Sequence, residues 1–269
     1  MCKSGAAQLA ITAAHLALGL CLIALPGCGS ADNRLVEETT EEYYPVQPDA
    51  TISVKNTDGS IRIYGADTDE VKVHATKKAY SAERVQKIAV NVSANPRALA
   101  IDTVFPPKAK RRPTFDRSGT VDYSIIVPQT CNISRLELAD GELVVEGIRG
   151  PGVKGSLING RLVSHNCFAN LQFSVVNGGL DLFYDWWEKR RIAIDLHTVT
   201  GGVRAVLPGD ATFKIIAEVQ SGQISDAFHP KEQERGGGSK SLNSEVGVNP
   251  QTQLTIRSTQ GYIKIEEAY

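Results

Sequence analysis

The sequence predicts an all-β solenoid whose coils are each about 20 residues long. The first observation is a motif that occurs seven times: a polar residue, a glycine, any residue and then a branched aliphatic residue. Between Gly141 and Gly222 successive copies lie 18 to 23 residues apart, the interval at which one supersecondary unit repeats to build a solenoid. The second observation is that apolar residues keep fixed places relative to these glycines. The glycines are Gly59, Gly141, Gly160, Gly178, Gly201, Gly222 and Gly261.

The positions around each glycine predict two strand segments per coil, each with one buried face. An aliphatic residue stands two positions after every glycine, and a mostly apolar position lies five before it. Polar and apolar residues alternate in between, as in Ile61-Arg62-Ile63, which indicates half-buried strands. Glycine adopts positive φ at little cost, so the glycines mark sharp corners. The two rows are Ile61, Leu143, Leu162, Leu180, Val203, Ile224 and Ile263, and Val54, Leu136, Gly155, Phe173, Leu196, Ala217 and Ile256.

Two architectures are compatible with this pattern. Asn-Gly between alternating strands is a strong hairpin signal, so an antiparallel β-sandwich of hairpins is the alternative. Hairpins would, however, give turn signals of similar strength about every 8 to 12 residues. The strong turn here recurs about every 20 residues, which favours a single-stranded parallel β-helix whose strands pair with the coils on either side.

The first 27 residues have the layout of a secretory signal peptide, with Lys3 before an uncharged, Ala- and Leu-rich stretch. This stretch ends in Leu25-Pro26-Gly27-Cys28, which resembles the bacterial lipoprotein box, where the cysteine is lipidated and becomes the first residue of the mature chain. We therefore predict lipidation of Cys28 and attachment to a membrane through an N-terminal lipid anchor. Gly29 and Ser30 follow without an Asp, which looks like sorting to the outer membrane. An uncleaved transmembrane anchor is the alternative.

Residues 28–49 are predicted to form an acidic flexible tether, because they contain four glutamates and two prolines but little apolar surface to bury. The whole chain has 29 basic and 30 acidic side chains, a net charge of −1, which gives no basic footprint for nucleic acid. The basic run from Lys108 to Arg112 is predicted to be a solvated loop, since prolines bracket it.

Two stretches near the start of the repeats resemble a known family: the segment from Ile52 to Gly65, ISVKNTDGSIRIYG, and Glu70-Val71-Lys72-Val73 after it. This segment is similar to the opening of the bacterial putative-adhesin domain family of unknown function, and Thr255 to Ile265 is similar to its last coil. The resemblance covers residues 50–267. It implies a right-handed, pectate-lyase-like β-helix, and it implies no catalytic residues.

Loop insertions are predicted near 105–118, 184–191 and 229–248, where the rhythm of the repeats breaks. The second insertion contains both tryptophans of the chain, and tryptophan, tyrosine and arginine together form a typical contact surface for a sugar or a protein partner. The predicted ligand or partner contacts are Tyr184, Trp186, Trp187 and Arg190. The alternative is that one tryptophan folds back over the flank of the solenoid.

No cofactor or metal site is predicted, because the histidines stand singly, without the paired spacing of zinc ligands. Asp181, Asp185 and Asp195 could converge on one flank as the acids of a polysaccharide lyase or hydrolase. Cys131 and Cys167 lie at nearly the same phase two repeats apart, about 9 to 10 Å if coils stack at strand spacing. That exceeds the reach of a disulfide, so we predict two buried free thiols.

These observations predict a lipid-anchored envelope protein that acts as a non-enzymatic binding or structural module, with a glycan or an envelope protein as its partner. Two other functions stay open: a polysaccharide-active enzyme on the same fold, and an envelope-stress or assembly factor that acts through protein contacts.

Overall fold

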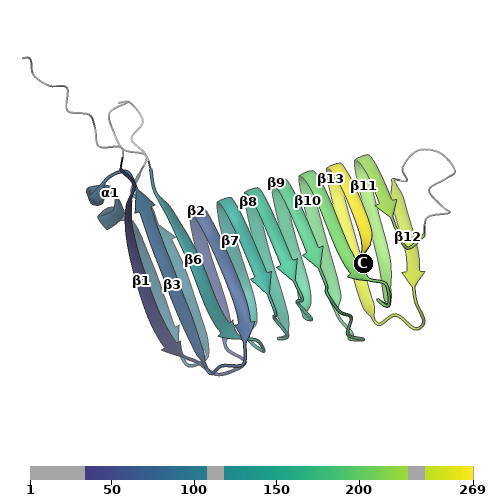
Figure 1. The fold of residues 1–269 in the computed structure, drawn as a ribbon, viewed down its shortest axis with the longest axis horizontal. Helices are drawn as coiled ribbons and strands as arrows, with labels where there is room; N and C mark the ends of the chain where they lie inside the picture. Colours follow the sequence, from purple (N-terminus) through teal and green to yellow (C-terminus); the bar gives the residue numbers. More distant parts are fainter. Residues whose placement is uncertain (1–33, 108–117, 230–239, 269) are drawn as a thin grey trace, which may run out of the picture. The chain divides into compact units, whose positions relative to one another are not determined.

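The computed structural model describes residues 34–107, 118–229 and 240–268. In this part the chain is all-β apart from one short helix, α1 (Ala82–Lys87), and 13 strands form a single mixed sheet that does not close on itself (Figure 1). No helix of these residues is long and apolar enough to cross a membrane. The predicted signal peptide and Cys28 lie outside the described residues, as does the basic run from Lys108 to Arg112.

Seven long strands, one per glycine motif, form the body of the sheet. They pair with one another in parallel. Among the described residues, the one antiparallel pair that any of them forms joins β11 to a strand outside the seven, β12 (Ser241–Val246). The repeats therefore run side by side in the same direction, as predicted for stacked coils. In spatial order the strands are β2 (Thr51–Ala66), β7 (Asn132–Glu146), β8 (Gly152–His165), β9 (Asn170–Phe183), β10 (Ala193–Pro208), β13 (Thr252–Ala268) and β11 (Phe213–Asp226).

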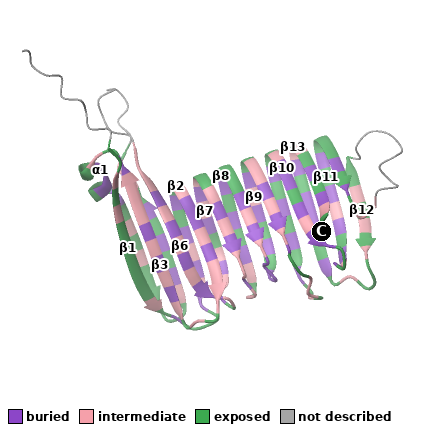
Figure 2. Ribbon diagram, in the orientation of Figure 1, coloured by how far each residue is buried: buried purple, intermediate pink, exposed green. Residues whose placement is uncertain are grey.

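Each long strand turns at its glycine, so that both halves face one core. In β8 the buried side chains before the turn include Leu157, and the first buried one after it is Leu162. Five positions separate the two, an odd number that would place them on opposite faces of a regular strand. Gly160 lies between them with φ +133°, and this left-handed residue restores both side chains to the inside. Figure 2 shows buried residues alternating with less buried ones along the long strands of the body of the sheet.

The core contains both of the predicted apolar rows. The aliphatic residue after each glycine is between 0% and 4% exposed, and the apolar residues of the preceding row are at most 1% exposed. Register explains why these rows are continuous: Leu143 pairs with Leu162, and Leu162 pairs with Leu180. Like residues therefore stack on like residues through successive strands.

One neighbour relation differs from the order of the sequence. The segment predicted to form the last coil, β13, lies between β10 and β11. Gly261 consequently pairs with both Gly201 and Gly222. The spacing of the motifs could not predict that β13 lies next to β10. Parallel strands whose glycines are in register can pair equally well whichever of β11 and β13 is the neighbour of β10.

The predicted tether is wrong over residues 36–45. These residues form β1 (Val36–Pro45), which pairs antiparallel with β3 (Glu70–Ala79) at the end of the sheet. The glutamates that suggested disorder lie opposite lysines of β3: the ion pairs are Lys72–Glu41 at 3.2 Å, Lys77–Glu38 at 2.9 Å and Lys78–Glu37 at 3.7 Å. Cross-strand charge pairs and backbone hydrogen bonds thus order a segment with little apolar surface.

Between β1 and β2, on the side of β2 away from β7, the remaining N-terminal strands build a divided coil. β5 (Ala98–Val104) pairs in parallel with the first half of β2, and β6 (Thr120–Pro128) pairs in parallel with its second half. β4 (Ala89–Asn95) pairs antiparallel with β5, and β3 pairs antiparallel with β6. Most of the insertion predicted near 105–118 lies outside the described residues.

The other two insertions differ in outcome. Residues 184–191 contain no strand or helix, as predicted. Within 229–248, Ser241–Val246 forms β12, an antiparallel partner of β11 at the other end of the sheet, so a loop throughout is wrong. Leu242 and Val246 pack against the core, which explains why this part of a polar segment is ordered. Cys131 and Cys167 are buried free thiols, as predicted.

Candidate binding surface

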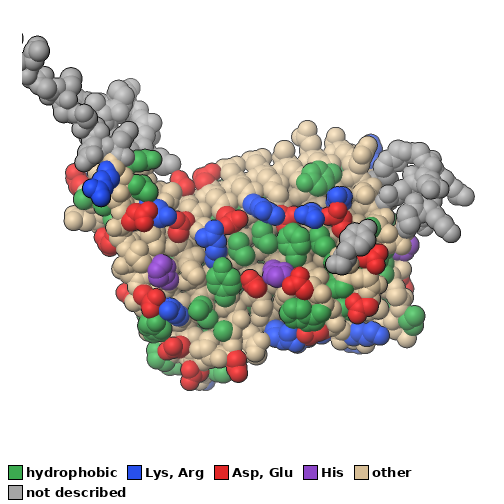
Figure 3. All heavy atoms as spheres, viewed as in Figure 1, with side chains coloured by type: hydrophobic (Ala, Val, Ile, Leu, Met, Phe, Trp, Pro, Cys, Tyr) green, Lys and Arg blue, Asp and Glu red, His purple; other side chains and the backbone are tan. Residues whose placement is uncertain are grey.

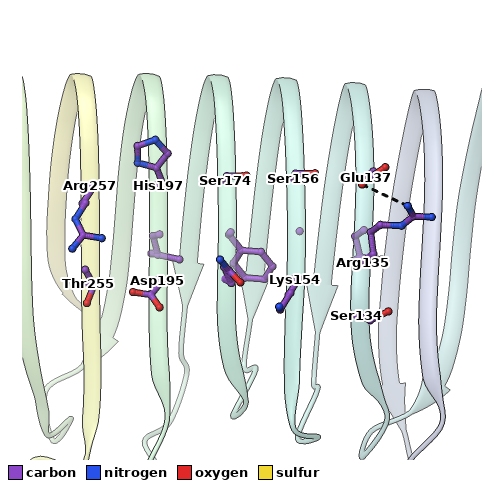
Figure 4. A pocket seen from close by; sticks show the side chains of 15 residues that line it. Ser134, Arg135, Glu137, Lys154, Ser156, Ser174, Asp195, His197, Thr255 and Arg257 are labelled. Carbon is purple, nitrogen blue, oxygen red and sulfur yellow. Dashed lines mark ion pairs between the residues drawn. The ribbon is translucent and has the colours of Figure 1, made fainter.

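A groove crosses the outer face of the first halves of β7, β8, β9, β10 and β13. It encloses about 650 Å³ and runs along the stack, roughly perpendicular to the strands (Figure 4). The side chains labelled in Figure 4 are mainly polar, and they come from five neighbouring strands. Each strand contributes its outward residues, because inward residues of the same segments belong to the core.

The groove is hollow because its centre has small side chains. Ser156 and Ser174 are partners in the register between β8 and β9 and form the floor. Larger residues occupy the same row on the neighbouring strands: Glu137 opposite Ser156, and His197 opposite Ser174. Beneath the floor, Gly155 leaves room for the ring of Phe173, since a Cβ at Gly155 would come within 2.9 Å of that ring.

Two of the charged groups at the groove form only long, exposed ion pairs with other described residues. Arg135 Nη1 lies 3.8 Å from Glu137 Oε1, the pair drawn as a dashed line in Figure 4, and Arg257 Nε lies 3.7 Å from Glu218 Oε2. Surface pairs of this kind contribute about 0 to 1 kcal/mol. Both guanidinium groups can therefore exchange their partner for a ligand at small cost.

Lys154 and Asp195 are different, because no ion pair or side-chain hydrogen bond joins either of them to another described residue. They flank Gln172 in one row, Lys154 opposite Gln172 and Gln172 opposite Asp195. A second hollow of about 310 Å³ adjoins the groove and is lined by the same three residues together with Asn132 and Asn170. The row of Lys154, Gln172 and Asp195 thus lies where the two hollows meet.

An exposed apolar row borders the groove on the side of the glycines. Ile158, Val176 and Val199 are 50%, 41% and 37% exposed, although they lie in the middle of well-ordered strands. Each stands two positions after a groove residue, namely Ser156, Ser174 and His197, and so points to the same side of the sheet. The surface therefore combines a polar channel with an apolar margin.

The predicted aromatic contacts do not form one surface. Tyr184 is only 1% exposed, and its hydroxyl donates a hydrogen bond to the backbone oxygen of Cys167 over 2.5 Å, so its assignment as a ligand contact is wrong. Trp187 packs between Tyr184 and Phe213, with ring centroids 5.5 and 6.1 Å away. Trp187 is therefore a tryptophan that folds back over the flank of the solenoid.

Of the predicted contacts, Trp186 is the most exposed. Its ring is 47% exposed and lies 5.7 Å from the ring of Phe168, while its Nε1 donates to Glu188 Oε1 over 3.2 Å. Glu188 also accepts two hydrogen bonds of 2.7 Å from Arg149. Arg190 donates to the backbone oxygen of Phe168 over 2.7 Å, so it fastens this loop rather than facing a ligand. Trp186 stays a predicted contact, held in place by these neighbours.

The aspartates proposed for an enzyme do not converge. Asp195 lies in the groove on the first half of β10, whereas Asp181 lies on the second half of β9 and pairs with Arg161 at 2.6 Å. Asp185 is on the loop after β9, where Asn166 and His165 bind its carboxylate. The hydrogen bond from Asn166, assisted by His165, lowers the pKa of Asp185. Among the described residues no three His, Cys, Asp or Glu side chains form a metal site.

Charges of both signs are mixed on the face seen in Figure 3, with hydrophobic side chains among them. At the groove, three cationic residues, Arg135, Lys154 and Arg257, stand beside two carboxylates, Glu137 and Asp195. Neither surface has the strongly basic character that binding to a phosphate backbone requires.

Sequence reasoning missed the groove, although its signal was present. Outward positions of the repeats change from long charged residues at both ends of the stack to serines in the middle, at Ser156 and Ser174. Comparison of the outward positions between repeats, rather than the inward ones, would have indicated a hollow.

No family model matches the chain, and no curated protein sequence matches it. Among solved structures, the chain is similar to a putative cell adhesion protein from Clostridium sporogenes, with 15% identity, a TM-score of 0.49, and coverage of 86% of this chain and 100% of that one. It is also similar to a putative adhesin from Bacteroides fragilis, with 12% identity, a TM-score of 0.29, and coverage of 85% and 97%. Likeness at this level does not establish a shared function.

Proposed function

We propose that this protein is a lipid-anchored component of the bacterial cell envelope whose body is a right-handed parallel β-helix with an adhesin-like, non-enzymatic binding function. The observation that carries the proposal is the groove across β7 to β13. The hydrogen-bonded strands of the sheet fix the backbone positions and the spacing of its polar side chains, so the backbone loses little conformational entropy on binding.

Binding fits the groove better than catalysis does. Hydrolysis of a glycosidic bond ordinarily needs two carboxyl groups that flank the bond, one of them with a raised pKa. The groove has Glu137, which faces Arg135, and Asp195, which lies three strands away across β8 and β9. About 4.8 Å separates neighbouring strands, so the two carboxyl groups are too widely spaced to act on one bond.

A bulky substitution on the groove floor tests the proposal. Ser174→Trp fills the hollow without touching the core, and Ser225→Trp is the matched control on the outward face of the second half of β11. Binding of the lipidated protein to isolated envelopes and to a glycan array is measured by fluorescence. We expect at least a tenfold loss for Ser174→Trp and no loss for Ser225→Trp. Equal binding by both variants would refute the groove as the binding site.

The array also separates the two classes of partner, since a glycan binds there and an envelope protein does not. Trp186→Ala, with Trp187→Ala as the variant that removes a packing residue, tests whether the exposed tryptophan takes part. Unchanged glycan binding by Trp186→Ala would exclude it as a contact.

The anchor is tested separately. Cys28→Ser removes the predicted acceptor of the lipid, and we expect the variant to move from the membrane fraction to the soluble fraction and to lose incorporation of labelled palmitate. Retention of Cys28→Ser in the membrane would favour the uncleaved transmembrane anchor instead.

A further inference from the structure

We propose that the groove recognises an acidic glycan, a hydroxyl-rich polymer that carries carboxylates, with Lys154 binding a carboxylate and Gln172 and Asp195 binding hydroxyl groups. This inference rests on the proposed binding function and names the class of ligand for the same surface.

The first argument is that no side-chain hydrogen bond or ion pair with another described residue occupies the polar groups of the central row. Lys154, Gln172 and Asp195 are consecutive in the register of β8, β9 and β10, and all three are exposed at the junction of the two hollows. An ammonium offers three donors, a carboxylate only acceptors and an amide both. Together they match a chain that presents an anionic group beside hydroxyls, which can both donate and accept.

The second argument is the sign of the charge. The lining has three cationic side chains and two carboxylates, whereas the whole chain has a net charge of −1. Lys154 has no intramolecular ion pair among the described residues, and the guanidinium groups of Arg135 and Arg257 are held only by exposed contacts of 3.8 and 3.7 Å. A carboxylate on the ligand can therefore pair with Lys154 without breaking an ion pair between described residues.

The third argument excludes the other extended polymers. A peptide that binds by strand addition needs a free sheet edge, and β8, β9 and β10 are each paired on both sides. A nucleic acid needs many cationic contacts along its backbone, and the two carboxylates in the groove oppose it. A glycan requires neither, because it is bound by hydrogen bonds to side chains and by contact of its apolar ring faces.

The apolar margin supplies that second kind of contact. Ile158, Val176 and Val199 lie along the groove at the spacing of the strands, about 4.8 Å, and are solvent-exposed. Exposed aliphatic side chains in a continuous row are typical of an interaction surface. A glycan that lies over Ser156 and Ser174 would have this apolar row along one side and Gln172 and Asp195 along the other.

The test uses an alginate oligosaccharide and the same oligosaccharide after reduction of its carboxyl groups to primary alcohols. Binding to the lipidated, detergent-solubilised protein is measured by calorimetry. We expect the alginate to bind at least tenfold more tightly than the reduced form, and the difference to shrink as salt is raised. Lys154→Gln should remove the difference between the two sugars, whereas Asp195→Asn should weaken both. Lys189→Gln, which changes an exposed lysine outside the groove, is the matched control and should bind as the unaltered protein does.

The outcomes separate this inference from the proposed function. Equal affinity for the two oligosaccharides overturns the acidic glycan, and a preference for alginate that survives Lys154→Gln overturns the assignment of Lys154 as the residue that binds its carboxylate. Failure of both to bind, while envelope binding stays sensitive to Ser174→Trp, also overturns it but leaves the binding function in place. Circular dichroism of each variant serves as the control for folding, so that a loss of binding can be distinguished from a loss of structure.

Discussion

A comparison of two single substitutions, Gly178→Ala and Gly179→Ala, tests the architecture most directly. Gly178 has φ +139°, and a Cβ there would lie 1.8 Å from the backbone oxygen of Gly160 on the next strand. Gly179 follows it, and a Cβ at Gly179 would meet nothing within 4 Å. The two substitutions are chemically identical, so any difference in stability reports the close approach of the strands.

The magnitude follows from two costs. A non-glycine residue at such a φ costs about 1 to 3 kcal/mol, and the Cβ can be accommodated only if the strands move apart, an overpacking cost of about 1 to 3 kcal/mol. Gly178→Ala should therefore lose about 2 to 6 kcal/mol, a large share of the about 5 to 15 kcal/mol that stabilises a typical domain. Gly179→Ala should change stability by no more than about 1 kcal/mol.

Urea unfolding, followed by tryptophan fluorescence and circular dichroism, measures both variants. The reasoning predicts a much lower midpoint for Gly178→Ala and an almost unchanged midpoint for Gly179→Ala. A loss below about 1 kcal/mol at Gly178, or equal losses at both positions, would show that the strands are not in the register described.

Three further predictions concern other parts of the fold. Burial raises the pKa of the Cys131 thiol to about 12 and that of Cys167 to about 11, so neither should react with a thiol reagent at neutral pH until the protein is unfolded; rapid labelling of the native protein would contradict this burial. The exposed ion pairs between β1 and β3 should weaken at about 1 M salt, where the Debye length is about 3 Å. Hydrogen exchange of the β1 amides should then speed up more than that of the β8 amides. Equal exchange rates of β1 at low and high salt would exclude a role for charge. The lowered pKa of Asp185 means that its ionised form is favoured in the folded state; its stabilisation is present above about pH 4 and is lost as the pH falls through the folded pKa. Asp185→Asn should therefore flatten the dependence of the midpoint on pH in the acid range, and an unchanged dependence would assign acid sensitivity to other carboxyl groups.

The glycine rhythm predicted the body of the fold because it reports a requirement of the backbone. Gly141, Gly160 and Gly178 lie in one line across adjacent strands, where only a residue without a side chain fits. With the backbone fixed at the glycine, the side chain of the aliphatic residue two positions later must point into the core. Such constraints act at every repeat, and a single sequence shows them as repetition.

Features that depend on contacts between distant segments left no comparable pattern. The glutamates of β1 read as a solvated chain because their lysine partners lie about 35 residues later in β3. Tyr184 is predicted as a contact residue because tryptophan and arginine stand beside it in the sequence, and nothing local shows that the backbone oxygen of Cys167 accepts its hydroxyl hydrogen bond. The groove was missed for the opposite reason: it arises from small side chains, which carry little signal in a search for chemical groups.

The position of β13 has a consequence for the way the molecule is made. β10 and β11 leave a vacant place between them until residues 252–268 have been synthesised, so a ribosome-bound chain that ends earlier presents two open strand edges to its surroundings. Exposed edges of this kind invite pairing with other chains. In the folded sheet β13 lies between two strands that precede it in the chain, so loss of residues 252–268 would remove a neighbour from both β10 and β11.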